Sequence, residues 1–304
     1  MKNLLDFALQ ERYDKVKKLR PNLEEMKNLL NWNTFLTLFP LEEASRGRPA
    51  YDKILMVRLL FLQSWYSLSD EELEFQVYDR LSFQHFLDYP ERIPDFTTVW
   101  RFRDELTETD IVDQIWQELQ QQITAKNVRI EKGVIQDASF IHADPGKTNS
   151  GMDDRGMAKT SRSRDGSWTK KNGKSYFGFK LHSKMQRGSK IITEIAVTTA
   201  KVHDSNIDLA VQEDIIYRDT AYTGVKTKAR GNGSMKRGKL SEHDKLRNKR
   251  ISKKRSQGEH PYATIHRSFG GGKTKLTTVA RVFVQQVFVC MAYNLHRLRF
   301  LVKS

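Results

Sequence analysis

The sequence predicts an α+β protein, in which an α-helical domain over residues 1–125 precedes a domain of mixed strands and helices over residues 126–304. Three observations predict this division. Apolar residues recur at helical spacing in the first part. Short β-branched runs replace that pattern near residue 126. The balance of charge also reverses there: residues 1–125 carry 15 Lys and Arg against 22 Asp and Glu, whereas residues 126–304 carry 37 against 15.

The first part predicts a series of packed helices. Segment 52–67 is apolar on nearly all sides, as expected of a helix in a protein core. Ser69 and Glu72 have the spacing of a capping box, which predicts that the next helix starts there. Another helix is expected after Pro94, with Val99 among its buried residues. A further amphipathic helix has apolar residues at a spacing of four: Ile111, Ile115, Leu119 and Ile123.

The second part predicts strands first and a helix at its end. Four β-branched runs predict strands, and the middle two form a hairpin through residues 186–189: 128–143, 175–185, 190–200 and 215–222. Segment 205–214 predicts a short helix. Pro261 is tolerated only in the first turn of a helix, so the last helical region is expected to begin near Gly258.

Two insertions in the second part are strongly polar. Residues 144–174 are rich in Gly, Ser and Lys and predict a long loop or mobile insertion. Residues 225–255 contain 13 Lys and Arg and two acids, and predict a flexible segment that faces a polyanion. Nucleic acid is the first candidate, because phosphate contacts supply most of the affinity of non-specific binding. The alternative is a basic surface that is simply solvated.

Membrane and disulfide-rich classes are disfavoured. The most apolar stretches, 54–66 and 279–295, are interrupted by polar residues such as Arg58 and Arg281, so no membrane span is expected. Cys290 is the single cysteine, which excludes an internal disulfide and fits a reducing compartment. It is expected to be a small core residue. The sequence has no signal-peptide pattern, and a cytoplasmic protein is expected.

Three acids have positions that suit metal-dependent chemistry. Asp137 and Asp219 each follow an apolar run and are expected near strand ends, and Glu259 is expected in a first helical turn, where the helix dipole favours its charge. An all-oxygen cluster suits Mg²⁺, with Mn²⁺ as a possible substitute, and not zinc. Two such ions could activate water for phosphodiester displacement. Each acid alone could equally be a turn former or a cap.

Other residues have two interpretations each. His142, His182 and His203 could form a histidine metal site, but their spacing is not that of zinc ligands. His182 and His203 could instead position a substrate or pack beside the site, and His203 could cap a loop. Trp168, in a basic setting, could stack on an unpaired base or anchor its loop.

Several blocks carry a resemblance to a known family: "IQDASF", "GKSYFGFKLH", "KVHDSN", "YRDTAYTG" and "RSQGEHPYATIHRSFG", in this order. In these blocks the chain resembles the IS5-type DDE transposases of bacterial insertion sequences, and the likeness extends through the N-terminal helical region. The resemblance implies an RNase H-like mixed-sheet catalytic domain after the helical one. It also implies Asp137, Asp219 and Glu259 as the catalytic and metal-binding triad.

The resemblance further implies a basic helper motif around the last acid. Arg255 matches its arginine and could clamp a phosphate with its planar fork. His266 stands where the family has Lys or Arg, with Arg267 next to it, and Ser252 stands where the family has Tyr. The neighbouring basic residues are expected to contact DNA phosphates: Lys249, Arg250, Lys253 and Lys254.

The function so implied is a transposase that cleaves and joins DNA phosphodiesters at the ends of an insertion sequence. Its expected partners are double-stranded DNA, as terminal inverted repeats and as target, and a second copy of the chain in a homodimer on DNA. The protein is expected in the bacterial cytoplasm, associated with the nucleoid. Two alternatives stay open: a catalytically inactive DNA-binding regulator of transposition, and a metal-dependent nuclease of the same fold without strand transfer.

Overall fold

The computed structural model describes residues 4–19, 22–40, 49–126, 133–146, 148–152, 158–160, 164–171 and 173–302. The chain divides into two compact units. The first comprises residues 1–127 and 298–304, and the second comprises residues 128–297. The division lies close to the predicted boundary after residue 125.

The first unit is helical, as predicted. Its elements are α1 (Leu4–Leu19), α2 (Asn22–Leu29), η1 (Trp32–Leu38), α3 (Lys53–Tyr66), α4 (Asp70–Asp79), α5 (Leu81–Phe86), α6 (Phe96–Glu105) and α7 (Ile111–Ala125). The predicted core helix is α3, which begins after the capping residue Asp52 and buries residues on all sides.

The local signals that predicted the other helices of the first unit are confirmed. Ser69 caps α4 by accepting a hydrogen bond from the Glu72 backbone N–H. Helix α6 starts after Pro94, with Asp95 as its cap, and Val99 is buried. The stripe of α7 is buried along its length: Ile111, Ile115, Leu119 and Ile123. Apolar periodicity and caps were therefore sufficient to place these helices.

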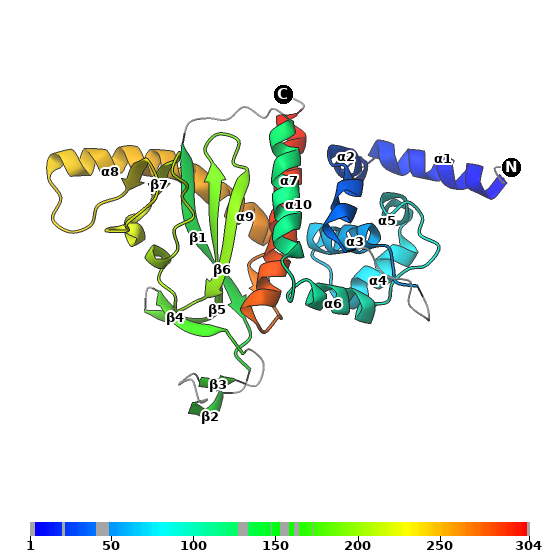
Figure 1. Ribbon diagram of the computed structural model, residues 1–304, viewed down its shortest axis with the longest axis horizontal. Helices are drawn as coiled ribbons and strands as arrows, with labels where there is room; N and C mark the ends of the chain where they lie inside the picture. Colours follow the sequence, from blue (N-terminus) through cyan, green and yellow to red (C-terminus); the bar gives the residue numbers. More distant parts are fainter. Residues whose placement is uncertain are drawn as a thin grey trace. The chain divides into compact units, whose positions relative to one another are not determined.

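The second unit is built on a mixed sheet (Figure 1). In the described residues seven strands run in the order β4-β5-β1-β7-β8, with β6 beside β5 and β9 beside β1. They are β1 (Val134–Ala143), β4 (Ser167–Lys171), β5 (Lys174–Gln186), β6 (Ile192–Thr199), β7 (Ile215–Arg218), β8 (Gly231–Ser234) and β9 (Lys273–Thr274). Strand β5 is antiparallel to β1 and β6, whereas β7 is parallel to β1 and β8 is parallel to β7. The predicted hairpin is the β5–β6 pair.

Strand β1 lies at the centre of this sheet and pairs with β5 over most of its length, from Val134 to His142. Gly178 of β5 lies opposite His142 in an unusual backbone conformation, with φ +154°. A Cβ at position 178 would lie 2.0 Å from the carbonyl oxygen of Ile141. Glycine therefore lets the two strands approach at this point.

Three helices follow the sheet in the chain: α8 (Glu242–Arg255), α9 (Glu259–Ser268) and α10 (Val279–Leu301). A short 3-10 turn, η4 (Ser256–Gly258), joins α8 to α9. Helix α8 extends along β7 and β8 at the outer end of this unit (Figure 1). In α10 the side chain of Asn294 forms two hydrogen bonds with the backbone of Ile192, which ties this helix to β6.

The prediction of a flexible segment over residues 225–255 is wrong. It contains β8 and the fourteen-residue helix α8. Ser241 caps the helix, acids occupy its first turn, and Lys253, Lys254 and Arg255 occupy its last turn, which complements the helix dipole. Two residues of the helix itself, Asn248 and Ile251, are buried. The high charge of the segment obscured the helical signal in the sequence. The helix nevertheless has favourable capping residues and buries a narrow face.

Two further predictions need correction. Residues 144–174 are more than a loop, because the described part contains β2 (Thr148–Met152), β3 (Ala158–Thr160) and β4, and β4 pairs with β5. Segment 205–214 is not an α-helix. Only the short 3-10 turn η2 (Asp204–Asn206) forms at its start. Gln136 bonds to the backbone of Ile207 and Leu209, which holds this segment extended.

Cys290 lies in α10 and is fully buried, as expected. Burial raises the pKa of its thiol far above the ordinary range, so it stays protonated. Within the described residues, no helix combines the length and the apolar character needed to cross a membrane.

Candidate active site

The parallel pairing of β1 and β7 brings Asp137 and Asp219 to neighbouring positions. Ile135 of β1 lies opposite Tyr217 of β7. Two residues further along each chain come Asp137 and Asp219, and side chains two apart point to the same face of a sheet. Asp219 directly follows β7, as predicted. Asp137 does not lie at a strand end, because β1 continues to Ala143 and pairs with β5 as far as His142.

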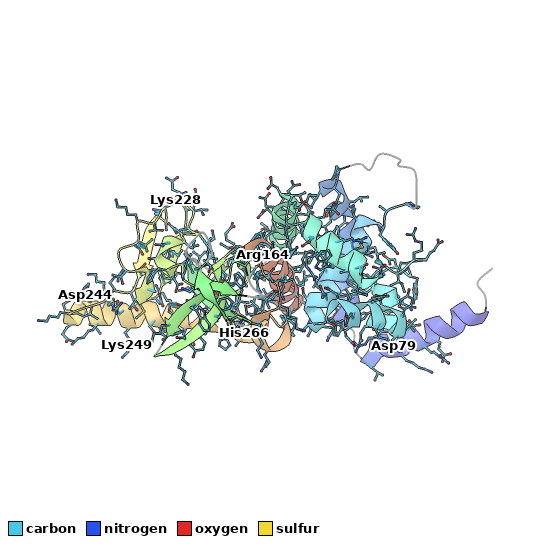
Figure 2. The ribbon with its side chains drawn as sticks, turned by 90° about the horizontal axis from the view of Figure 1, so that it is seen from below. Asp79, Arg164, Lys228, Asp244, Lys249 and His266 are labelled. Atoms are coloured by element: carbon cyan, nitrogen blue, oxygen red, sulfur yellow. The ribbon has the colours of Figure 1, made fainter. Side chains whose placement is uncertain are left out.

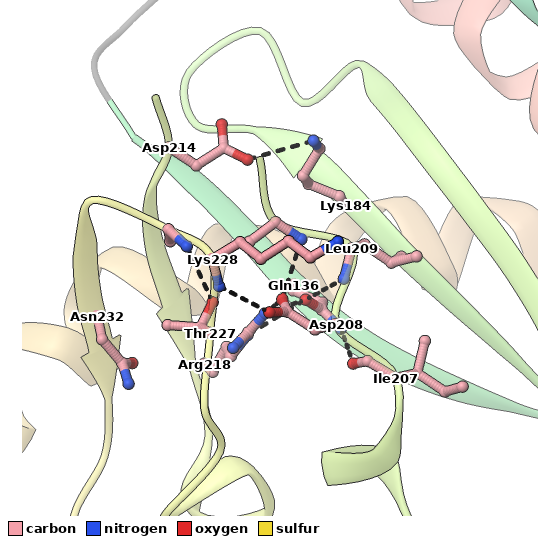
Figure 3. A network of polar contacts seen from close by, with 12 residues as sticks. Gln136, Lys184, Ile207, Asp208, Leu209, Asp214, Arg218, Thr227, Lys228 and Asn232 are labelled. Carbon is pink, nitrogen blue, oxygen red and sulfur yellow. Dashed lines mark hydrogen bonds and ion pairs between the residues drawn. The ribbon is translucent and has the colours of Figure 1, made fainter. Parts of the chain in front are cut away.

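A buried polar network fixes the residues that precede the two aspartates (Figure 3). The guanidinium group of Arg218 is fully buried and donates to the side-chain oxygen of Gln136 at 2.6 Å and to Asp208. Asp208 also accepts hydrogen bonds from the backbone N–H groups of Ala210 and Lys228. The network thus ties β1 to β7 one residue before each aspartate.

Asp137 lies in a largely buried setting, with 17% of its side chain exposed. Its carboxylate accepts a hydrogen bond from Arg255 Nη1 at 2.6 Å, and Tyr262 donates to its backbone carbonyl at 2.8 Å. Burial raises the pKa of Asp137 from 3.8 to about 6, and the negative charges of Asp219 and Asp204 add to the rise. Arg255 opposes this rise. The poorly solvated carboxylate of Asp137 therefore has other negatively charged side chains near it.

Glu259 is connected to Asp137 through the same arginine. Arg255 Nη2 lies 3.7 Å from the Glu259 carboxylate, so both acids lie within the span of one guanidinium group. Glu259 is the first residue of α9, as predicted, but 70% of its side chain is exposed. Gly258 before it has helical angles, so η4 leads directly into α9. Glu259 therefore stands at a joint between helices and not at a free helix end, where the full dipole would act.

The joint lies close to β1 because residue 258 is glycine. A Cβ there would lie 2.9 Å from Cγ2 of Ile135. One turn later, Tyr262 is buried and its hydroxyl contacts both the Asp137 carbonyl and Ser183 Oγ. The start of α9 is thereby held against β1 beside Asp137.

The fit of this site to a divalent cation can be judged from its donors. Asp137 and Asp219 offer oxygen ligands, and the raised pKa of Asp137 marks negative charge that a cation would balance. In the part of the chain that is described, no three His, Cys, Asp or Glu side chains are grouped closely enough to hold an ion. Arg255 pairs with Asp137 instead. The aspartate pair fits a divalent cation, and Glu259 would have to move to become a third ligand.

The basic residues of α8 fall into two groups. Lys249, Arg250 and Lys253 are exposed, and Figure 2 shows Lys249 on the outer surface of this helix. Lys245, Lys249 and Lys253 follow one another at a spacing of four and form a stripe on one face. Lys254 faces inward: its Nζ donates to the Tyr217 hydroxyl at 3.0 Å and lies over that ring. Lys249 and Lys253 of the stripe are exposed, whereas Lys245 pairs with Glu242 and Lys254 supports β7.

The residues after Glu259 form a second basic group. His266 Nε2 lies 2.9 Å from Ser139 Oγ of β1, and partial burial together with His142 lowers the pKa of His266. His266 is therefore a neutral ring at neutral pH and does not supply the positive charge of a Lys or Arg. Arg267 is exposed next to it. A positive charge at this end of α9 thus comes from Arg267.

Trp168 lies on β4, with 45% of its surface exposed. Its ring meets Phe177 of β5 at an edge, with 5.3 Å between the ring centroids. One part of the ring therefore anchors β4 and another part is open to solvent. Both interpretations, base stacking and anchoring, are compatible with this position.

The histidines are held by packing and capping contacts. His182 is fully buried, hydrogen bonds to Thr198 Oγ1, and burial lowers its pKa to about 4. His203 accepts a hydrogen bond from the Ser205 backbone N–H and caps η2, which agrees with the loop-cap interpretation. Because no three such ligands are grouped in the described residues, the histidine metal site gains no support.

Four residues of the site were not singled out from the sequence: Gln136, Asp204, Arg218 and Tyr222. Gln136 and Arg218 stand beside the two aspartates in "IQDASF" and "YRDTAYTG", and a polar residue in an apolar strand was the available signal. Asp204 forms an ion pair with Lys180 at 2.8 Å. Tyr222 ends η3 (Thr220–Tyr222), which Asp219 caps by accepting from the Ala221 N–H.

Comparison with known families matches both parts of the chain. Residues 10–105 match a family model described as a Transposase domain, and residues 129–295 match one described as a Transposase DDE domain. The second match contains Asp137, Asp219 and Glu259, together with the sheet and α8 and α9. No solved structure matches the chain.

Proposed function

The chain belongs to the DDE transposase family, and we propose that it cleaves and joins DNA phosphodiesters at the ends of an insertion sequence. One observation carries this proposal: the register of β1 and β7 sets Asp137 beside Asp219, and Arg255 links Asp137 to Glu259. The IS5 subtype and a homodimer on DNA remain part of the proposal.

In this mechanism Asp137, Asp219 and Glu259 hold divalent cations, with Mg²⁺ as the first candidate. When bound, such ions activate water and stabilise the leaving oxygen in phosphodiester displacement. A water oxygen attacks the phosphorus at the element end, the P–O3′ bond breaks, and a 3′-hydroxyl is released. That hydroxyl then attacks a phosphodiester of the target DNA: a new P–O bond joins the two DNAs, and the P–O3′ bond of the target strand breaks and releases a 3′-hydroxyl of the target. No covalent bond to the protein is required.

The residues of this chain supply position and charge. The buried network of Gln136, Arg218 and Asp208 holds β1 and β7 in register, so that the two aspartates stay together. Arg255 balances Asp137 in the free protein. A phosphate presents the same kind of oxygen acceptor as a carboxylate, and the planar fork of Arg255 suits both. We propose that Arg255 exchanges Asp137 for a DNA phosphate when DNA binds.

The exposed basic residues bind the DNA backbone in this proposal: Lys249, Arg250, Lys253 and Arg267. Like charges at a spacing of four destabilise a helix by a few tenths of a kcal/mol per pair. The stripe on α8 therefore costs some stability, which a DNA duplex would repay through its phosphates.

The test is cleavage of a labelled duplex that carries the element's own end, with Mg²⁺, by the native chain and by Glu259→Gln. The substitution keeps the size of the side chain and removes its charge. We expect cleavage to be lost and binding of the duplex to be retained. Equal cleavage by both proteins would contradict the assignment of Glu259, and a native chain that binds but never cuts would favour the regulator. Joining of paired ends to a target distinguishes a transposase from a nuclease.

A further inference from the structure

The phenol of Tyr222 is rigidly held close to the candidate carboxylates. Its ring is fully buried, and the guanidinium carbon of Arg218 lies 5.2 Å from the ring centroid. Its backbone ends the short turn that Asp219 caps. The hydrogen bonds from Arg218 to Gln136 and Asp208 hold its guanidinium group in place, and this group packs against the Tyr222 ring.

The hydroxyl of this phenol has no hydrogen-bond partner among the residues that the structure describes. The other buried tyrosines of the described residues are satisfied, and Tyr13 donates to the Glu24 carboxylate. Tyr262 bonds to Ser183 and to the Asp137 carbonyl, and Tyr293 donates to the Lys190 carbonyl. A buried hydroxyl without a partner is unfavourable, so this exception among the buried tyrosines is a candidate for a functional role.

The surroundings of the hydroxyl are acidic. Burial, followed by the negative charges of Asp204, Asp137 and Asp219, raises the pKa of Tyr222 far above its ordinary value. The group is therefore an O–H donor at every working pH. Asp204 is already balanced, because Lys180 Nζ lies 2.8 Å from its carboxylate and also donates to the Val202 carbonyl. Two buried polar atoms therefore lack a partner at this place in the described residues, the Tyr222 hydroxyl and Nη1 of Arg218, and of these only the hydroxyl is uncharged.

We propose that Tyr222 Oη donates a hydrogen bond to an oxygen atom of the group that binds at Asp137 and Asp219. This inference rests on the proposed function. The oxygen belongs to a cation-bound water or to a DNA phosphate. A neutral donor suits this place, because Arg255 already balances Asp137 and a further positive side chain would compete with a cation, whereas a phenol adds a donor without adding charge.

The test compares Tyr222→Phe with Tyr293→Phe as the matched control. Each variant removes one buried hydroxyl. Because only the Tyr293 hydroxyl has a partner, we expect Tyr293→Phe to lower the denaturation midpoint of the free protein. Tyr222→Phe should leave that midpoint unchanged or raise it.

The second readout is binding of Mn²⁺ measured by isothermal titration, first alone and then with the uncleaved end duplex. Tyr222→Phe should weaken one of these two steps about tenfold, the effect of one lost hydrogen bond. Weaker binding of Mn²⁺ alone assigns the oxygen to a bound water. A loss confined to the step with DNA assigns it to a phosphate. Tyr293→Phe should match the native chain in both.

Two results would overturn the inference. The first is a Tyr222→Phe variant that binds Mn²⁺ and the duplex, and cuts, as the native chain does. The second is a denaturation midpoint that falls as much as in Tyr293→Phe, since the hydroxyl would then have a partner within the fold. If Tyr222→Phe does not fold, ¹³C-tyrosine spectra of the native chain replace it, and tyrosine Cζ signals that stay unchanged both on adding Mg²⁺ and on then adding the duplex would count against the inference. A native chain that neither binds metal nor cuts would instead refute the proposed function.

Discussion

Asp137→Asn should make the folded protein more stable while it abolishes cleavage. The native carboxylate is 17% exposed, and its pKa is raised from 3.8 to about 6 with the Arg255 ion pair already in place. A tenfold change in proton affinity corresponds to about 1.4 kcal/mol. The ionised carboxylate therefore costs the fold about 3 kcal/mol at pH 7.5, and a neutral amide of the same shape removes that cost.

The pH dependence gives the sign of this effect. A carboxyl group with a raised pKa stabilises the fold fully below its unfolded pKa of 3.8, and this contribution is lost as the pH rises through about 6. The advantage of Asp137→Asn should thus be largest above pH 7 and fall to roughly half of its full size at pH 5.

The assay is hydrogen exchange of the β1 amides in increasing urea, at pH 7.5 and at pH 5, for the native chain and the variant. This readout follows the second unit by itself, which avoids mixing the unfolding of two units. A variant that is less stable than the native chain at pH 7.5 would refute the argument. A difference in free energy of unfolding between variant and native chain that is the same at both pH values would also refute it. Asp137 would then be a structural ion-pair partner of Arg255.

Three further outcomes are expected. Replacing Lys249 and Lys253 together by Ala should reduce the slope of log affinity against log salt by roughly two, measured by DNA titration at several salt concentrations, because each phosphate contact contributes about 0.9. Arg218→Met should lower the free energy of unfolding by roughly 3–5 kcal/mol in urea, because it removes the positive partner of the Asp208 carboxylate and a buried donor to Gln136. Gly178→Ala should cost at least about 2 kcal/mol in the same experiment, because its Cβ meets the Ile141 carbonyl.

Each of these outcomes has a matched control. Lys15→Ala removes an exposed lysine of α1 and should leave the salt slope unchanged. Arg230→Met replaces an exposed arginine and should be nearly neutral in urea. Gly173 also has a positive φ, but a Cβ at position 173 would have no atom within 4 Å. Gly173→Ala should therefore lower the free energy of unfolding by less than Gly178→Ala. Equal effects of a variant and its control would contradict the corresponding argument.

The elements that sequence reasoning placed correctly are those with local signals. Helix α7 follows from its stripe of apolar residues, and α4 follows from Ser69 three positions before Glu72. The β5–β6 hairpin follows from two β-branched runs separated by a short turn. These patterns depend on neighbours within about one or two turns of chain, which a sequence displays directly.

The elements that were misjudged depend on distant partners or on weak periodicity. Helix α8 has few apolar residues, so its caps and its basic last turn were the remaining signals. Segment 205–214 has a helical composition, but Gln136, about 70 residues earlier in the chain, bonds to its backbone and holds it extended. The position of Asp137 inside β1 depends on pairing with β5.

The candidate site was only partly predictable for the same reason. The acids could be named from their blocks, and Asp219 was expected at the end of its strand. The link from Arg255 to Asp137 joins residues 118 positions apart. The unsatisfied hydroxyl of Tyr222 is a property of three-dimensional packing. Neither has a counterpart in residue spacing.

The parallel pairing of β1 with β7 has a consequence for the order of assembly. A contact such as that between Gln136 and Arg218 closes a loop of 82 residues, whereas the β5–β6 hairpin closes within a short turn. Contacts of long sequence separation form late, because the entropy of loop closure must be overcome first. A nascent chain that has released the hairpin, but not yet residues 215–259, holds Asp137 without its two acidic companions. Under the proposed function, the three acids that cut DNA therefore come together only after the ribosome has completed most of the chain.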